Sequence, residues 1–229
     1  MTIRHSTSPL IRGAAHVLGQ LNDRHPWSHN QHFHRWILRS LPSDCTRVLD
    51  VGCGHGDLVA VLADRGIEVD GIDPDSAMAE HCVRRFREQP HVRITRSTLE
   101  QFAQARDARC YDAITMVASL HHMDLEQALK TARGLLRPGG RLLVVALTAP
   151  GGFVDTLWDV GNALSNPLIG LAKHPRPAAG PPSEDGMPVK DPVMPYAELR
   201  DRTRAVLPGA TLRRREGFRV TLSWQKPGD

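Results

Sequence analysis

The sequence predicts an α/β fold in which a mostly parallel sheet has helices on both faces. Three observations predict it. Short apolar runs alternate with helical patterns between Arg47 and Leu147, as in successive βα units. The run RLLVVAL at 141–147 carries one charged residue, which is typical of a strand buried on both faces. The 229 residues are 41% hydrophobic and 24% charged, which suits one domain with a substantial core.

The first βα unit starts with a strand at 47–51, RVLDV. A helix is expected after Gly56, because apolar side chains then recur at helical spacing. Gly66 is the expected residue just beyond this helix, where glycine tolerates the left-handed conformation that often ends a helix.

The second unit starts with a strand at 68–73, EVDGID. Pro74 suits the first turn of the next helix, since a backbone N–H at that position has no partner within the helix. The apolar side chains of this helix recur every four residues, at Met78, Cys82 and Phe86. A short third strand is expected at 92–95.

The fourth strand is expected at 111–118, YDAITMVA. The next helix starts beside Asp124, which is spaced from Gln127 as in a capping box. The Pro-Gly-Gly sequence at 138–140 is expected to end this helix, so that the fifth strand covers 141–147. Near the C-terminus, a further helix is expected from about Tyr196 to Val206, and the runs TLRRR and FRVTLSW predict a hairpin.

The composition argues against several classes of protein. The net charge is +4 and the pI about 9.1, but the basic residues are scattered apart from Arg213 to Arg215, which argues against a nucleic-acid binder. Four cysteines without a CxxC pair argue against disulfides and a cysteine zinc site. No apolar run reaches the length of a membrane span, and the N-terminus lacks a signal-peptide core, so we expect a cytoplasmic protein.

Three alternate glycines, Gly52, Gly54 and Gly56, follow the first strand directly. Such a turn leaves backbone N–H groups open at the start of a helix and lets a ligand approach the main chain. The third glycine comes one residue earlier than in the dinucleotide pattern G-x-G-x-x-G, and no G-K-[ST] of a P-loop follows. Asp73, 19 residues after Gly54, is placed to bind the hydroxyls of an unphosphorylated ribose.

The stretch DVGCGHG at 50–56, together with Asp73, resembles motif I and its acidic partner in the class I S-adenosylmethionine-dependent methyltransferases. YDAITMVASLHHMD and LLRPGGRLLVVAL are similar to the fourth- and fifth-strand segments of that family. The resemblance covers residues 45–148 and, less closely, 196–226. It implies a Rossmann-like, seven-stranded, mostly parallel sheet in the order 3-2-1-4-5-7-6, with a reversed C-terminal hairpin and with S-adenosyl-L-methionine as cofactor.

The same resemblance implies four parts of one domain. Residues 1–45 are an N-terminal helical lid, and residues 46–148 are the S-adenosylmethionine-binding core. Residues 149–195 are a variable insert that covers the substrate, and residues 196–229 complete the domain with a helix and a β-hairpin. The insert has apolar side chains that could form a wall of the acceptor site: Phe153, Leu157, Trp158 and Leu164.

The resemblance also assigns the cofactor contacts. Those expected are Asp50, Gly52, Cys53 and Gly54 at the methionine end, Val117 and Ala118 under the methyl group, Asp73 at the ribose, and Pro74, Met78, Thr98 and Leu99 at the adenine. Asp50 is expected to act on the amino group through backbone or water. Many family members have an acidic residue where Thr98 and Leu99 stand, so we expect a backbone or Thr98 contact there instead.

Histidines supply the candidate catalytic residues. His121 and His122 follow the fourth strand, at the sheet edge where ligands bind in such folds, so one of them could be a general base. The alternative is that they cap the next helix or contact the cofactor backbone. A second group at 25–34 lacks a completing acid or cysteine, so we expect no metal and place Trp27 and His32 near the cofactor carboxylate or the acceptor.

The expected function is methylation of a small molecule, with an oxygen atom as the first choice of acceptor. A nitrogen or carbon acceptor, and a non-catalytic partner protein that only binds the nucleoside, are the alternatives. An NAD-dependent reductase is disfavoured by the glycine spacing and by the lack of a Tyr-x-x-x-Lys pair. The sequence leaves open whether the protein is a monomer or a homodimer.

Overall fold

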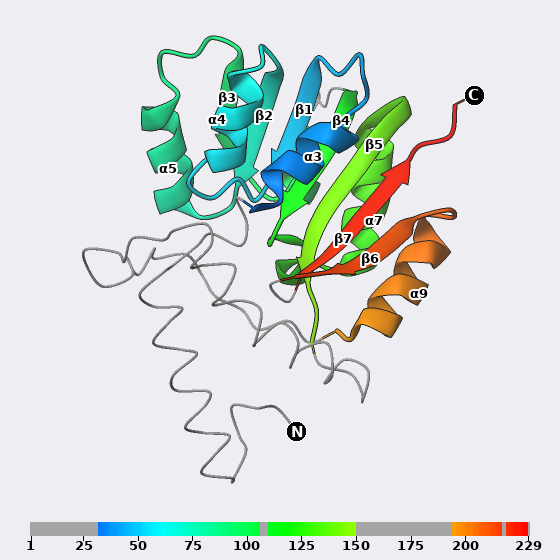
Figure 1. Cartoon of the computed structure of the whole chain (residues 1–229). Helices are drawn as coiled ribbons and strands as arrows, with labels where there is room; N and C mark the ends of the chain where they lie inside the picture. The colour runs from blue at the N-terminus through cyan, green and yellow to red at the C-terminus, as the bar shows by residue number, and fades with distance from the viewer. Residues whose placement is uncertain (1–31, 106–109, 150–193, 217–218, 229) are drawn as a thin grey trace, which may run out of the picture.

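The computed structural model describes residues 32–105, 110–149, 194–216 and 219–228. These residues form a central sheet with helices on both faces (Figure 1). Residues 1–31 of the expected lid, with Trp27, and residues 150–193 of the expected insert, with its four apolar residues, lie outside the described residues, so their roles stay predictions.

The sheet has seven strands in the order β3-β2-β1-β4-β5-β7-β6. Their bounds are β1 Arg47–Val51, β2 Glu68–Asp73, β3 Val92–Arg96, β4 Tyr111–Val117, β5 Leu136–Leu147, β6 Thr211–Arg215 and β7 Arg219–Gln225. The first five are parallel, whereas β7 runs antiparallel to both β5 and β6. The predicted order and the reversed hairpin are therefore confirmed. The carboxyl ends of β1 to β5 meet at one edge of the sheet.

The helices form two layers. Their bounds are α3 His34–Ser40, α4 Asp57–Ala63, α5 Ser76–Arg85, α6 Leu99–Gln104, the 3₁₀ turn η2 Leu120–His122, α7 Leu125–Leu135 and α9 Tyr196–Val206. Helices α3, α4 and α5 pack on one face of the sheet, and α6, α7 and α9 pack on the other (Figure 1). Each face has its own apolar core, and β1 and β4 contribute side chains alternately to both.

Two helix starts differ from the expectation. Helix α5 begins at Ser76 rather than at Pro74, because the carboxylate of Asp75 accepts the N–H groups of Ala77 and Met78 and so caps it. Helix α6 was not expected. Thr98 and Gln101 form a reciprocal capping box at its start, a local signal that the pattern at 98–101 does contain.

The fifth strand also begins earlier than expected. The Pro-Gly-Gly sequence does not separate it from α7, because β5 already pairs with β4 at Leu136. Gly139 has a φ of 78°, and a Cβ added at Gly140 would be 3.0 Å from the carbonyl oxygen of Tyr111. Glycine is needed here because two backbones approach closely where the β4–β5 register shifts.

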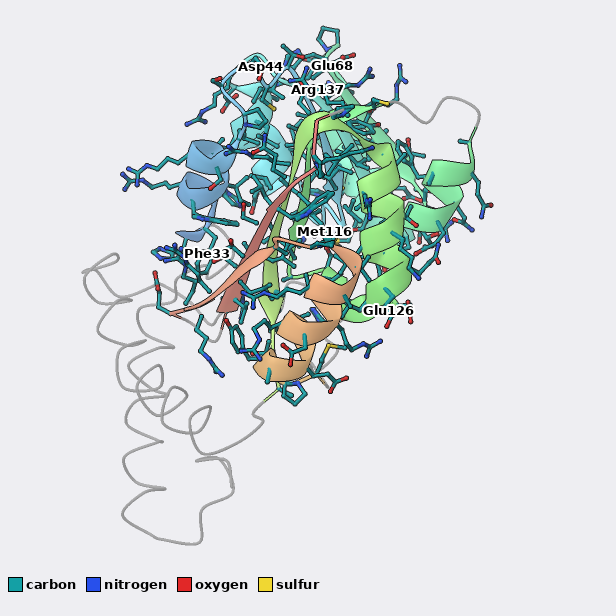
Figure 2. The ribbon with its side chains drawn as sticks, turned by 90° about the vertical axis from the view of Figure 1, so that its right-hand side faces the viewer. Phe33, Asp44, Glu68, Met116, Glu126 and Arg137 are labelled. Carbon is teal, nitrogen blue, oxygen red and sulfur yellow. The ribbon has the colours of Figure 1, made fainter. Side chains whose placement is uncertain are left out.

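A network of buried polar groups holds the amino edge of the sheet together. Asp112 accepts from the backbone N–H groups of Thr46 and Arg47 at 2.6 and 2.9 Å and from the Thr46 hydroxyl at 2.9 Å. Arg137 adds an ion pair of 2.7 Å to the same carboxylate. Figure 2 shows Arg137 at this end, close to Asp44, while Phe33 lies toward the opposite end.

We predict that Asp112→Ala lowers the free energy of unfolding by about 2–4 kcal/mol, because it leaves several donors and a cation without their buried acceptor. Urea denaturation measures the effect. Asp44→Ala is the control, since it removes the exposed partner of the same Arg137 and should cost much less. Equal losses in the two variants would contradict a special role for the buried carboxylate.

Candidate active site

The turn between β1 and α4 contains three glycines whose backbone lies in the left-handed region. Gly52, Gly54 and Gly56 have φ values of 73°, 53° and 80°, which residues with a Cβ rarely adopt. A Cβ added at Gly52 would overlap the Cβ of Ser119, and one at Gly56 would be 2.5 Å from the ring of Phe86. Conformation and close packing therefore both require glycine.

Backbone hydrogen bonds tie this turn to the end of β2. The N–H groups of Gly52 and Cys53 donate to the carbonyl of Ile72 at 2.8 and 3.1 Å. The N–H of Gly54 donates to a carboxylate oxygen of Asp73 at 2.9 Å. The two sequence features that predict a nucleoside site, the glycines and the acid after them, are thus in direct contact.

Asp73 lies at the carboxyl end of β2 with its carboxylate largely buried. One oxygen accepts from Gly54, and the other accepts from the N–H of Asp75 at 2.9 Å. A carboxylate oxygen can accept two hydrogen bonds, so each oxygen keeps one acceptor position. That is the capacity needed for the 2′ and 3′ hydroxyls of a ribose, and the residues present fit the expected nucleoside.

Asp50 is a second buried acid on the neighbouring strand, and it is 2% exposed. Burial raises its pKa to about 7, although a 2.7 Å hydrogen bond from the hydroxyl of Thr115 opposes the shift and the charge of Asp73 adds to it. A cation bound nearby would favour the ionised form. The sulfonium and ammonium groups of S-adenosylmethionine fit that requirement.

Cys53 contributes its backbone, and not its side chain, to the side of the turn that would face the cofactor. Its side chain is buried in the core beside α4 and α5. A hydrogen bond with the thiol of Cys82 and burial raise the pKa of Cys53, so the thiol stays neutral and is no nucleophile. The Cys82 thiol donates to the carbonyl of Gly54 at 3.0 Å, which gives the turn one more anchor.

The expected adenine contacts lie beyond β2 and β3. Pro74 is exposed and Met78 is half-buried. The hydroxyl of Thr98 accepts the N–H of Gln101 as the cap of α6, and the side chain of Leu99 is buried in the core. An adenine contact by Thr98 or Leu99 would therefore use the half-buried start of α6 and its backbone, and it stays a prediction.

The chain turns sharply after β4 and brings the two candidate histidines together. Val117 ends the strand, Ala118 has a φ of 54°, and η2 follows at once. The imidazole rings of His121 and His122 have centroids 4.1 Å apart, with His121 half-buried and His122 exposed. The turn starts at the sheet edge where the glycines and Asp73 also lie.

His32 contacts the C-terminal hairpin, and its expected place near the cofactor carboxylate or the acceptor stays a prediction. Its Nε2 is 2.8 Å from a carboxylate oxygen of Glu216, so it joins the start of the described chain to the β6–β7 hairpin. His34 is buried, and burial lowers its pKa although Asp57 opposes the shift. Among the described residues, no three histidine, cysteine or acidic side chains come together as metal ligands, and no helix is long and apolar enough to cross a membrane.

The sequence did not predict the contacts of three residues near the carboxyl edge of the sheet. Ser119 packs against Gly52, Thr115 bonds to Asp50, and Glu216 bonds to His32. Each pair is separated by 65 or more positions in the chain, so no local pattern could predict the contact.

Relatives of known family match most of the chain or its core. A family model for a methyltransferase domain matches residues 49–142. A protein of Mycobacterium tuberculosis, known as an uncharacterized methyltransferase, is 33% identical over 211 residues, which cover 88% of this chain and 98% of that protein. The ubiquinone biosynthesis O-methyltransferase of Coxiella burnetii is 33% identical over 109 residues, 47% of this chain and 46% of its own length.

Solved structures share the fold. The S-adenosylmethionine-dependent methyltransferase SibL matches with a TM-score of 0.58 at 19% identity, over 86% of this chain and 55% of that chain. The N-methyltransferase NodS from Bradyrhizobium japonicum matches with a TM-score of 0.53 at 14% identity, over 86% and 96%. With the near full-length relative and the observed strand order, these findings show that the chain belongs to the class I S-adenosylmethionine-dependent methyltransferases.

Proposed function

We propose that this enzyme transfers a methyl group to an oxygen atom of a small molecule, with His121 or His122 as the general base. The observation that carries the proposal is the histidine pair in the turn after β4, at the edge that also holds the glycine turn. A partial relative is named an ubiquinone biosynthesis O-methyltransferase, and it supports oxygen as the acceptor atom.

The cofactor supplies a methyl group that is already activated by its sulfonium sulfur. The glycine turn would bind the methionine end through bare backbone, and Asp73 would orient the ribose through its two free acceptor positions. Fixing the cofactor in this way supplies rate by holding donor and acceptor in line. The acids Asp50 and Asp73 would favour the cationic cofactor over its neutral sulfur product.

The imidazole would accept the hydroxyl proton as the acceptor oxygen bonds to the methyl carbon and the carbon–sulfur bond breaks. A methylated oxygen, S-adenosylhomocysteine and an imidazolium result. The half-buried His121 is the more shielded of the two rings, and His122 is the more accessible. A phenol or alcohol needs such a base, whereas a carboxylate or thiolate acceptor does not.

The other expected functions stay predictions. A nitrogen or carbon acceptor would use the same cofactor site. A binding protein without turnover would keep the glycines and Asp73 but would not depend on the histidines. The small-molecule acceptor and the cytoplasmic location are likewise proposals, and monomer and homodimer stay open.

Asp73→Ala should weaken S-adenosylmethionine binding by about 1–3 kcal/mol, or roughly 5- to 150-fold, because a charged acceptor for two hydroxyls is lost. Isothermal titration calorimetry measures the change. Asp64→Ala, on the exposed end of α4, is the charge-matched control and should bind normally. Unchanged affinity in Asp73→Ala would place the ribose elsewhere.

Cofactor affinity should rise with pH through the titration of Asp50. Its pKa of about 7 means that the empty site holds a proton at lower pH, and the bound cation must displace it. Between about pH 5.5 and about pH 7, the affinity of the wild type for S-adenosylmethionine should rise relative to that of Asp50→Asn, by at most about tenfold per pH unit. Above about pH 7 the ratio of the two affinities should change little. A constant ratio between the two proteins would refute this linkage.

Replacing the base should slow methyl transfer roughly 10²- to 10⁴-fold without weakening cofactor binding. His121→Ala and His122→Ala are assayed separately by release of S-adenosylhomocysteine with a panel of phenols and alcohols. His91→Ala is the control, since that imidazole contacts the carbonyl of Ala63 at the far edge of the sheet. Full activity in both test variants would remove the base from the mechanism.

A further inference from the structure

The turn after β4 contains an unfavourable backbone conformation. Ala118 has a φ of 54°, and among the described residues it is the one non-glycine residue with a positive φ. This region is unfavourable for an alanine, because its Cβ crowds the backbone there, so the surrounding structure must hold it in place. The N–H of Ala118 donates to the carbonyl of Val145 at 2.8 Å, which fixes the turn against β5.

The consequence of this conformation is the position of Ser119. Its hydroxyl donates to the carbonyl of Val51 at 2.6 Å, and Val51 is the last residue of β1. Its Cβ occupies the space that a side chain at Gly52 would need. Ser119 therefore holds the peptide group that begins the glycine turn both by a hydrogen bond and by packing.

Ser119 also belongs to the segment of the candidate base. Its carbonyl accepts the N–H of His122 at 3.1 Å, in the 3₁₀ turn that carries both histidines. One half-buried serine thus contacts the cofactor turn on one side and the acceptor turn on the other. The hydrogen bond from Ser119 acts at the Val51–Gly52 junction, at the methionine end of the site, whereas the carboxylate of Asp73, which would hold the ribose, takes its hydrogen bonds from Gly54 and Asp75.

We propose that Ser119 is a positioning residue that fixes the glycine turn in the conformation that binds the amino-acid tail of the cofactor. Ser119 acts through Val51 and Gly52 and need not touch the cofactor. The role depends on the family's cofactor and on the assignment of the methionine end to the glycine turn. It does not depend on the acceptor or on a histidine base, so the two proposals can fail separately.

Three ligands separate positioning of the tail from a general loss of structure. S-adenosylmethionine and S-adenosylhomocysteine carry the amino-acid tail, whereas 5′-methylthioadenosine has the same nucleoside without it. Ser119→Ala should bind the first two about 3- to 10-fold more weakly, the effect of one lost hydrogen bond, and should bind methylthioadenosine normally. Calorimetry on the full chain measures all three affinities.

Thr46→Val is the matched control, because it removes a hydroxyl hydrogen bond at the opposite edge of the sheet. It should leave all three affinities unchanged. Normal binding of methylthioadenosine also shows that Ser119→Ala is folded. Equal affinity of wild type and Ser119→Ala for S-adenosylhomocysteine would overturn the proposal. So would an equal loss for methylthioadenosine, which would indicate a merely structural serine.

Discussion

The constraint on which this structure depends is the path of the chain from β1 to α4. It must turn at the crowded edge of the sheet, between the ends of β2 and β4, where a Cβ at Gly52 or Gly56 would collide with neighbouring side chains. Three left-handed glycines meet that requirement, and their neighbours use the space they leave: Ser119 packs against Gly52, and Phe86 packs against Gly56. Glycine is therefore needed both for the left-handed path of the turn and for the tight packing of its neighbours.

Two buried acids, Asp50 and Asp73, lie at the carboxyl edge of the sheet, and their hydrogen-bond donors differ. Asp73 accepts hydrogen bonds from two backbone N–H groups. Asp50 accepts a hydrogen bond from the hydroxyl of Thr115, and burial raises its pKa to about 7. A cationic ligand compensates the cost of burying negative charge here, which couples the choice of ligand to the protonation of the site.

The amino edge of the sheet contributes to stability, whereas the carboxyl edge carries the candidate active site. At the amino edge, Asp112 has four donors and Tyr111 donates to Asp70 at 2.7 Å, so the buried carboxylates of Asp112 and Asp70 both have hydrogen-bond donors. The carboxyl edge holds Ala118 with its positive φ, the buried Asp50 with its raised pKa and the left-handed glycine turn. Such unfavourable features persist where they serve a ligand and where packed structure around them holds them in place.

The sequence by itself determined the strand order, through the resemblance, and the pairing of Gly54 with Asp73 at one site. Both depend on local signals, since apolar period, glycine spacing and the end of a strand are visible in a short window. It misplaced the starts of α5 and β5 and missed α6, because side-chain caps and strand pairing decide those boundaries. Only the tertiary structure decided that Ser119 would hold Val51, that Thr115 would bond to Asp50 and that His32 would bond to Glu216. These partners are 68, 65 and 184 positions apart, and folding brings them together through packing that no local pattern records.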